Sequence, residues 1–202
     1  MGRSSDAPAG ASLRIAQRDS TRRSIVRAAG SCFRRQGFGA TTVEDIARAA
    51  GTTRTTFYMY FKGKADVVAA LSESVRRDTH LLLDELETAV ASGRGDDFRA
   101  WLSRLFDFWE RAGTAMRAEE EAASFHPEVQ ARRWSSFQNG MDAIARGLEA
   151  GGISDDAGRR ARGLLAYSQL ETIFHRWMRV GWDVDRDQVL EVMTDMWLAA
   201  FR

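Results

Sequence analysis

Hydroxyl, aromatic and basic side chains are concentrated in one short stretch, "TTRTTFYMYFKGK", at residues 52–64. Threonine and tyrosine are weak helix formers, so helix stability does not explain their density here. The hydroxyls can donate and accept hydrogen bonds, the rings offer apolar faces, and Arg54 and Lys64 add positive charge. The chemistry that these groups offer is the recognition of a partner through hydrogen bonds, ring contacts and charge.

Helical spacing separates this stretch into a buried face and exposed faces. Phe57 and Phe61 are four residues apart, so on a helix they share the face that packs against its neighbours. The remaining faces point outward, where arginine can pair with guanine, threonine can contact a base, and tyrosine can reach a phosphate. In an alternative interpretation, Tyr58, Met59 and Tyr60 pack on another helix. Three further pairs have the same spacing: Arg54 with Tyr58, Thr55 with Met59, and Thr56 with Tyr60.

The elements that must position this stretch can be read from capping residues and glycines. Ordered structure is expected to begin near Ser20, with a first helix that ends at Gly37. Thr42 is a predicted N-cap for a short second helix, which Gly51 ends. A third helix is expected from Thr52 or Thr53 to about Phe61. Two short helices joined by a tight glycine turn are typical of a helix-turn-helix.

The charge distribution agrees with a polyanionic partner. The chain has a net charge of +1, but residues 1–66 carry +7 and residues 67–202 carry −6. Positive charge confined to one end suits nucleic acid, whose affinity comes largely from counterion release around phosphates. A solvated basic tail is the alternative that charge alone leaves open.

Composition and motifs narrow the remaining classes. The 202 residues include only 2 Pro and 1 Cys, and their apolar residues recur at helical spacing, which predicts an all-α fold. No membrane span or export segment is expected, so a cytoplasmic protein is predicted. No nucleophile elbow, phosphate-binding glycine loop or metal-ligand spacing is present, so we expect neither an enzyme nor a cofactor or metal.

The segment "TTVEDIARAAGTTRTTFYMYFKGKADVV" resembles the DNA-binding signature of the TetR family of transcriptional regulators. The resemblance covers residues 20–70 and includes the family's Thr-x-Tyr-x-x-Phe-x-x-Lys spacing at Thr56, Tyr58, Phe61 and Lys64. It implies about nine helices, a homodimer, and repression of an operator that a small molecule relieves. It also implies base contacts by Arg54 and Thr55. The phosphate contacts that it implies are those of Thr42, Thr53, Tyr58, Tyr60 and Lys64.

On this interpretation the chain has three parts. Residues 1–19 are a predicted disordered basic arm, residues 20–66 a three-helix DNA-binding head, and residues 67–202 a helical ligand-binding and dimerisation domain. Lys64 heads a long helix, and a glycine-containing link is expected at Gly113. All 6 Trp follow residue 100, and large aromatic side chains either fill a core or line an apolar pocket. The predicted pocket for a small apolar or aromatic effector is lined by Trp101, Phe106, Trp109, Met116, Phe125, Trp134, Phe137, Met141 and Phe174.

The last two helical patterns are suited to assembly. Leucines, aromatic residues and methionines recur at helical spacing through residues 155–181 and again through residues 189–200. Such segments are too apolar to face water, so we expect a four-helix packing across a two-fold axis in a homodimer. Burial within one subunit is the alternative.

Two other function classes remain as alternatives. A helical small-molecule carrier would have an incidental basic head, but it has no need of an outward Arg54, Tyr58 and Tyr60. A nucleoid-type DNA binder without sensing is the other, and the aromatic C-terminal two thirds argues against it. The sequence therefore favours a ligand-responsive transcriptional repressor.

Overall fold

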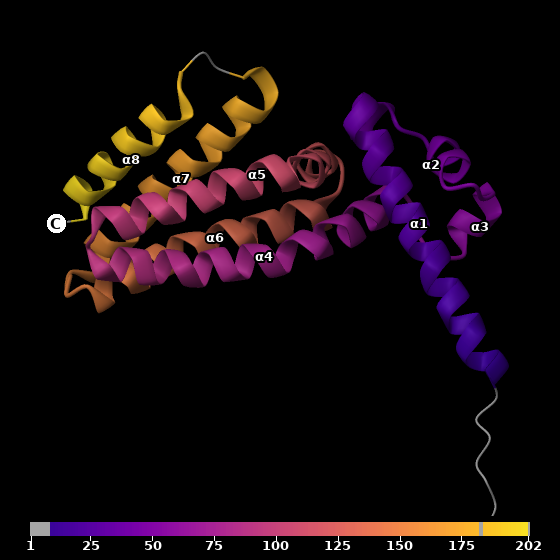
Figure 1. Cartoon of the computed structure of the whole chain (residues 1–202), viewed down its shortest axis with the longest axis horizontal. Helices are drawn as coiled ribbons and strands as arrows, with labels where there is room; N and C mark the ends of the chain where they lie inside the picture. Colours follow the sequence, from indigo (N-terminus) through magenta and orange to yellow (C-terminus); the bar gives the residue numbers. More distant parts are fainter. Residues whose placement is uncertain (1–8, 182–183, 202) are drawn as a thin grey trace, which may run out of the picture. The chain divides into compact units, whose positions relative to one another are not determined.

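Every regular element in the described part of the chain is a helix, which confirms the all-α prediction. The computed structural model describes residues 9–181 and 184–201, with side chains from residue 15 onward except those of residues 74, 77, 178 and 179. Backbone contacts group the chain into two compact units (Figure 1). The first unit comprises Met1–Glu73 and Thr114–His126, and the second comprises Ser74–Gly113 and Pro127–Arg202. The predicted functional boundary at residues 66 and 67 stays a prediction.

The first unit is built on the long helix α1. Helix α1 packs on α2, and α2 packs on α3. The first unit also contains the beginning of α4 and the end of α5. The bounds of these helices are Ala9–Ala40 for α1, Val43–Ala49 for α2, Arg54–Tyr58 for α3, Lys64–Ser92 for α4 and Gly95–Ala123 for α5.

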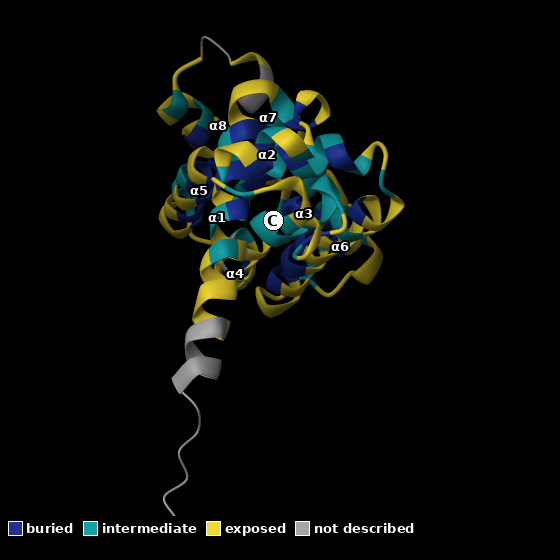
Figure 2. Ribbon diagram, turned by 90° about the vertical axis from the view of Figure 1, so that its right-hand side faces the viewer, coloured by how far each residue is buried: buried dark blue, intermediate teal, exposed yellow. Residues whose placement is uncertain are grey.

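Helix α1 begins earlier than the sequence pattern indicated. It starts at Ala9 rather than near Ser20, so residues 9–19 are helical and not the expected disordered arm. Residues 15–20 are exposed, and Figure 2 draws the exposed part of the α1 ribbon in yellow. An exposed helical turn has no apolar stripe to reveal it. Alanine, leucine, glutamine and arginine nevertheless favour helix, and no proline interrupts the segment after Pro8. Residues 1–8 of the predicted arm lie outside the described residues.

Gly37 interrupts α1 where the sequence predicted the end of the first helix. Its φ of 78° and ψ of 168° are not helical, and the helix resumes for Phe38–Ala40. A positive φ costs a residue with a Cβ, so glycine permits this break. With the break counted, the eight helices of the described residues form nine helical segments.

Apolar side chains of the first three helices form a continuous core in the first unit. Ile25, Cys32 and Ile46 are fully buried, and Phe57 lies against Phe61 with ring centroids 5.8 Å apart. Both phenylalanines are buried, which confirms the predicted inner face of the third helix. Cys32 is a core residue.

The second unit consists of long helices. The link expected at Gly113 is absent, because α5 runs without a break through this position. A single glycine costs a helix only about 1 kcal/mol, and helix-forming alanine, methionine and arginine flank this one. The helices after α5 are α6 at Pro127–Ala150, α7 at Asp156–Val180 and α8 at Arg186–Ala200.

Glycines allow α6 and α7 to approach closely. A Cβ at Gly163 would lie 2.6 Å from the carbonyl oxygen of Met141, and a Cβ at Gly140 would overlap the ring of Tyr167. A larger residue at Gly163 would therefore displace the backbone of α6, and one at Gly140 would displace the Tyr167 ring. Burial raises the pKa of Tyr167 to about 12, and Glu171 adds to the effect. Within the described residues, none of the helices has the length and apolarity needed to span a membrane.

Candidate nucleic-acid interface

A capping box fixes the start of α2. The Thr42 hydroxyl accepts a hydrogen bond from the Asp45 amide at 3.1 Å, and the Thr42 amide donates to Asp45 Oδ2 at 3.0 Å. The Thr42 hydroxyl also donates to Asp45 Oδ2 at 2.7 Å. These hydrogen bonds, first that of the Thr42 side chain, hold the pKa of Asp45 below its ordinary value of 3.8. The predicted N-cap is confirmed. The Thr42 hydroxyl, which was also expected to contact phosphate, already makes the hydrogen bonds of this cap.

The turn between α2 and α3 is closed by Gly51 and a second threonine cap. Gly51 has a φ of 66°, which permits the sharp turn after α2. Thr53 is the N-cap of α3 and accepts a hydrogen bond from the Thr56 amide at 3.1 Å. Helix α3 ends at Tyr58 instead of near Phe61, because Met59 and Tyr60 bond back in a tight turn to Thr55, Thr56 and Phe57. The helix-turn-helix is therefore present, with a five-residue second helix.

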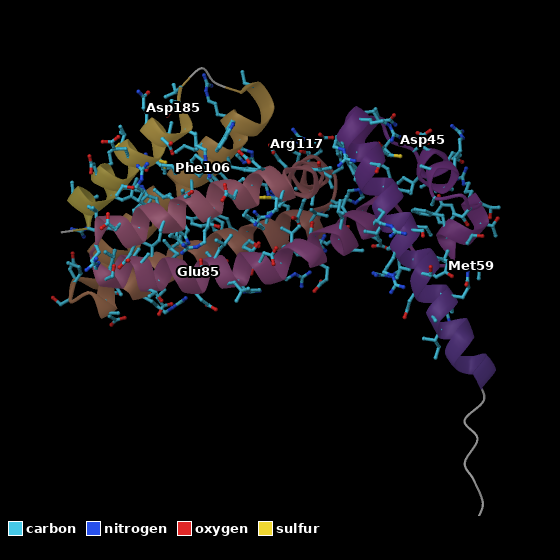
Figure 3. The ribbon with its side chains drawn as sticks, viewed as in Figure 1. Asp45, Met59, Glu85, Phe106, Arg117 and Asp185 are labelled. Carbon is cyan, nitrogen blue, oxygen red and sulfur yellow. The ribbon has the colours of Figure 1, made fainter. Side chains whose placement is uncertain are left out.

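Helix α3 presents polar and aromatic side chains to the outside. The Arg54 side chain is 61% exposed and Tyr58 is 47% exposed. Thr55 is exposed and Tyr60 is half-buried. Figure 3 shows Met59 on the outside of α3, and this side chain is 72% exposed. The alternative in which Tyr58 and Met59 pack on another helix does not agree with their exposure.

Arg54 is paired on the surface of the unit before any partner binds. Its guanidinium forms an ion pair with Glu44 of α2 and lies 5.6 Å from the centre of the Tyr58 ring. Tyr58 first, and Glu44 second, raise the pKa of Arg54. A base can take the place of Glu44 only if this exposed ion pair opens, and exposed pairs of this kind contribute little to stability.

Lys64 is engaged inside the first unit. Its ammonium donates to the carbonyls of Phe38 at 2.7 Å and Gly39 at 3.2 Å, and it lies 4.3 Å from the centre of the Phe38 ring. Burial lowers the pKa of Lys64, and the charge of Glu121 opposes that shift. A lysine ammonium has three N–H donors. The predicted phosphate contact of Lys64 therefore competes with contacts that Lys64 already makes.

The first unit has exposed arginines on α1 in addition to Arg54 and Lys64. Arg22 lies over the Phe61 ring at 5.3 Å, which links this charge to the core beneath α3. Sequence reasoning counted these charges but named none of them as site residues. The arginine density of residues 14–35 was the available signal. The exposed arginines on α1 are Arg18, Arg22, Arg23, Arg27, Arg34 and Arg35.

The predicted pocket residues of the second unit fall into separate aromatic groups. Phe106 and Trp109 of α5 lie within 5.4 Å of aromatic rings of α7, namely those of Trp177 and Phe174. Figure 3 labels Phe106 on α5 within this unit. We call these four residues the α5–α7 cluster. A separate group joins Trp134 to Phe137, with ring centroids 5.5 Å apart, and Phe137 to Tyr167.

Trp101 belongs to neither of these groups. Its indole N–H donates to the carbonyl of Leu82 at 2.7 Å, and its ring stacks on Phe98. Trp197 of α8 lies 4.8 Å from Phe98, so α5 and α8 share this core. An indole whose N–H and ring are both engaged is a structural residue.

Two further predicted pocket residues are exposed. Phe125 follows the end of α5 and is 76% exposed, and Trp134 on α6 is 59% exposed. Their exposure places both rings at the surface of the chain and not in its core. Met116 and Met141 are half-buried, and Met116 lies in the first unit.

Sequence reasoning missed a pocket at the ends of several helices in the second unit. It is open, has a cavity volume of ≈ 80 Å³, and is lined by apolar residues of α4, α5, α6 and α8 and of the segments that follow α6 and α8. Val90, Phe98, Leu148, Leu198 and Phe201 contribute side chains to it. No periodicity identifies it, because these residues are brought together by the helix termini.

Comparison with known proteins shows the family of this chain. A model of the tetR family of bacterial regulatory proteins matches residues 25–71, which include the helix-turn-helix. The HTH-type transcriptional regulator TtgR of Pseudomonas putida is 30% identical over 183 residues, or 82% of this chain and 83% of TtgR. EthR of Mycobacterium tuberculosis is 31% identical over 97 residues, or 48% of this chain and 44% of EthR. The chain is a DNA-binding transcriptional regulator, and it belongs to the TetR family.

Solved structures agree with this assignment. A complex of SmeT with triclosan is 27% identical, has a TM-score of 0.66, and covers 89% of this chain and 90% of SmeT. A second structure is described as SmeT, the repressor of the Stenotrophomonas maltophilia multidrug efflux pump SmeDEF, with 25% identity and a TM-score of 0.66. It covers 90% of this chain and 91% of SmeT.

The capping box at Asp45 should make the free energy of unfolding depend on pH. Because the folded-state pKa of Asp45 is depressed, its carboxylate stabilises α2 above the ordinary pKa and loses this effect as the pH falls through the folded value. Asp45→Asn is expected to lower the free energy of unfolding at neutral pH, with a difference from the wild type that disappears in acid. Urea unfolding from about pH 7 to about pH 2 measures this difference. Asp84→Asn, on an exposed part of α4, is the control; an equal pH dependence in both variants would contradict the assignment.

Proposed function

We propose that this chain binds an operator through α3 and represses transcription until a small apolar or aromatic molecule releases it. The observation that carries the DNA contact is the exposure of Arg54, Thr55 and Tyr58 on a helix whose Phe57 is fully buried. A rigid anchor beneath an exposed polar face is the requirement for reading bases in the major groove. Family membership supports the same assignment.

Each residue of the interface has a proposed role. Arg54 and Thr55 contact bases, and Tyr58 and Tyr60 contact phosphates. Thr42 and Thr53 are exposed helix caps, so their contacts with phosphate add to a structural role. The Lys64 ammonium has three N–H donors, of which two bind carbonyls, so its third N–H contacts a phosphate. The arginines of α1 strengthen binding to any sequence by counterion release.

The operator is found by sequencing genomic fragments that the purified protein retains at moderate salt, and variants then test the roles. Arg54→Ala is expected to relax preference at one base position and to cost about 1–3 kcal/mol on the operator. Glu44→Gln opens the ion pair and removes a negative charge, so it is expected to strengthen binding to every sequence. Fluorescence anisotropy with operator and random duplexes measures both effects.

The control for these variants is a matched ion pair in the second unit. Arg104 and Glu85 are partly exposed and lie 2.9 Å apart. Arg104→Ala and Glu85→Gln should leave both affinities at wild-type values. Equal loss on operator and random DNA in Arg54→Ala would contradict base reading. A wild-type protein that retains no genomic fragment selectively would refute operator binding itself.

The effector site that we propose is the α5–α7 cluster. Phe106, Trp109 and Phe174 are buried apolar rings from two helices, and rings of this kind bind planar apolar molecules by stacking and area burial. SmeT, described as the repressor of a multidrug efflux pump, has been solved in complex with triclosan. Trp101, Phe125 and Trp134 are not part of this proposed site. Phe137 and Met141 remain secondary candidates, and Met116, which lies in the first unit, is not part of the proposed site.

Release of DNA by such a molecule can be measured directly. Triclosan and similar compounds are expected to lower the affinity of the wild type for its operator. Phe174→Leu removes an aromatic ring from the α5–α7 cluster, so it is expected to raise the compound concentration needed for release by about tenfold. Phe125→Leu, at an exposed ring, is the matched control and should behave as the wild type. Binding of a compound without any change in operator affinity would refute the proposed coupling.

The surface of α7 and α8 supports a homodimer. These helices contact each other, since Trp197 Nε1 donates to Gln169 Oε1 at 2.7 Å and Arg162 Nε donates to the Ala200 carbonyl at 2.7 Å. Leu164 and Leu165 of α7, with Val192 and Met196 of α8, remain exposed. Exposed apolar patches are typical of protein–protein interfaces, so we propose that a second copy of the chain covers this face of α7 and α8.

A single charge should disrupt this face. Leu165→Glu places a carboxylate where the partner subunit would cover it, so we expect the dimer to dissociate at micromolar concentration. Analytical ultracentrifugation measures the change in mass. Leu81→Glu alters a comparably exposed leucine on α4 and should remain dimeric. A Leu165→Glu protein with the mass of the wild type would move the interface elsewhere.

A small-molecule carrier without a regulatory role is not favoured, because the carrier hypothesis leaves the exposed face of α3 unexplained. We also propose that catalysis and cofactors have no part in this function, because DNA and effector are both held by non-covalent contacts. Its place of action is the cytoplasm, where bacterial DNA is found.

A further inference from the structure

The end of α1 after Gly37, together with the residue that follows the helix, is held by side chains from distant parts of the sequence. Gly37 breaks the helix, and Thr41 closes the segment by donating its hydroxyl to the Gly37 carbonyl at 2.7 Å. Thr42, the next residue, is the N-cap of α2. The path of this segment therefore determines where α2 begins, and α2 carries α3. We call residues 37–41 the α1–α2 link.

Glu121 binds the amides of this link. The amide of Phe38 donates to Glu121 Oε2 at 2.7 Å, and the amide of Gly39 donates to the same oxygen at 3.1 Å. Glu121 lies in the last turn of α5, 83 residues from Phe38 in the sequence. The absence of a side chain at Gly37 also makes room for this contact, because a Cβ there would crowd Glu121 Oε2 at 3.2 Å. The glycine thus provides both the backbone conformation and the room for the carboxylate.

Lys64 binds the other side of the same two residues. It donates to the carbonyls of Phe38 and Gly39, while Glu121 accepts from their amides. The ring of Phe38 is buried, with Phe33 5.6 Å away and His126 6.2 Å away. The backbone of two consecutive residues is therefore fixed by an acid from α5 and a base from α4. Hydrogen bonds to charged groups are about twice as strong as neutral ones.

We propose that Glu121 is a positioning residue for operator recognition, which acts by fixing the α1–α2 link and with it the orientation of α2 and α3. The inference rests on the proposed DNA-binding function of α3. Glu121 itself makes no contact with DNA in this proposal. Its effect is specific to sequence reading, because base contacts require α3 in one orientation, whereas binding to phosphates depends mainly on charge.

Loss of the carboxylate is compatible with a folded protein. Gly39 is exposed, so water can replace the lost acceptor at this end of the link. Phe57, Ile46 and Ile25 remain buried in the core that joins the first three helices. The expected consequence of losing Glu121 is a mobile link between intact helices.

Three substitutions of Glu121 separate hydrogen bonding from charge. Glu121→Ala removes the acceptor and is expected to lower affinity for the operator about tenfold, the lower end of the range for a hydrogen bond to a charged group. Its affinity for random DNA should be equal to or above that of the wild type, because a negative charge is lost. Glu121→Gln keeps an oxygen that can accept from both amides, so it should restore operator affinity. Glu121→Asp keeps the charge but is too short, so it should resemble the alanine variant on the operator and the wild type on random DNA.

Anisotropy titrations with the operator and a random duplex, together with thermal unfolding, measure these effects. Glu110→Ala changes an exposed carboxylate on the same helix and should equal the wild type on both duplexes. Wild-type operator affinity in Glu121→Ala, equal losses on both duplexes, or a glutamine variant as weak as alanine would each overturn the inference. If alanine does not fold, the glutamine and aspartate variants decide in the same way. Failure of the wild type to select any operator refutes the proposed function instead.

Discussion

The burial of Phe57 is the interaction on which the proposed interface depends. Helix α3 has five residues, and an isolated helix of this length does not persist in water. Phe57 is fully buried against Phe61 and the core of the first unit, so tertiary packing supplies the order that the helix lacks. The Thr53 cap then satisfies a backbone amide at its beginning. Because the anchor occupies one face, the polar residues on the others are held outward at fixed positions.

Two cations near the proposed DNA surface have partners within the first unit. Arg54 is paired with Glu44, and Lys64 is bound to backbone carbonyls, so neither cation is without a partner in the absence of DNA. In the proposed complex, a base replaces Glu44 as the partner of Arg54, and the arginines along α1 add attraction that does not depend on sequence. On this proposal, opening the Arg54–Glu44 pair has a cost at every sequence, and only a correct base offsets that cost by bidentate pairing.

The second unit distributes its aromatic residues between structure and recognition. Trp101 joins α4 to α5 through its hydrogen bond with Leu82, and its ring belongs to the core shared with α8. The α5–α7 cluster joins rings from two helices, with Phe106 packed on Trp177 and Trp109 on Phe174. Glycines between α6 and α7 bring these helices close together. A ligand that enters between aromatic rings would therefore act on helices that are already tightly packed.

Local chemistry by itself determined much of this protein. The threonine caps, the glycine turn at Gly51, the buried Phe57 and Phe61, and the helical character of the chain all follow from interactions within a few residues, which a sequence displays directly. The start of α1 at Ala9 and the continuity of α5 through Gly113 were missed, because an exposed helix has no apolar stripe and one glycine is a weak break. Only the tertiary structure decided that Lys64 and Glu121 hold the α1–α2 link, that Glu44 pairs with Arg54, and which aromatic side chains are core or surface. These contacts join residues up to 83 positions apart, and the packing of helices, which no local pattern encodes, brings them together.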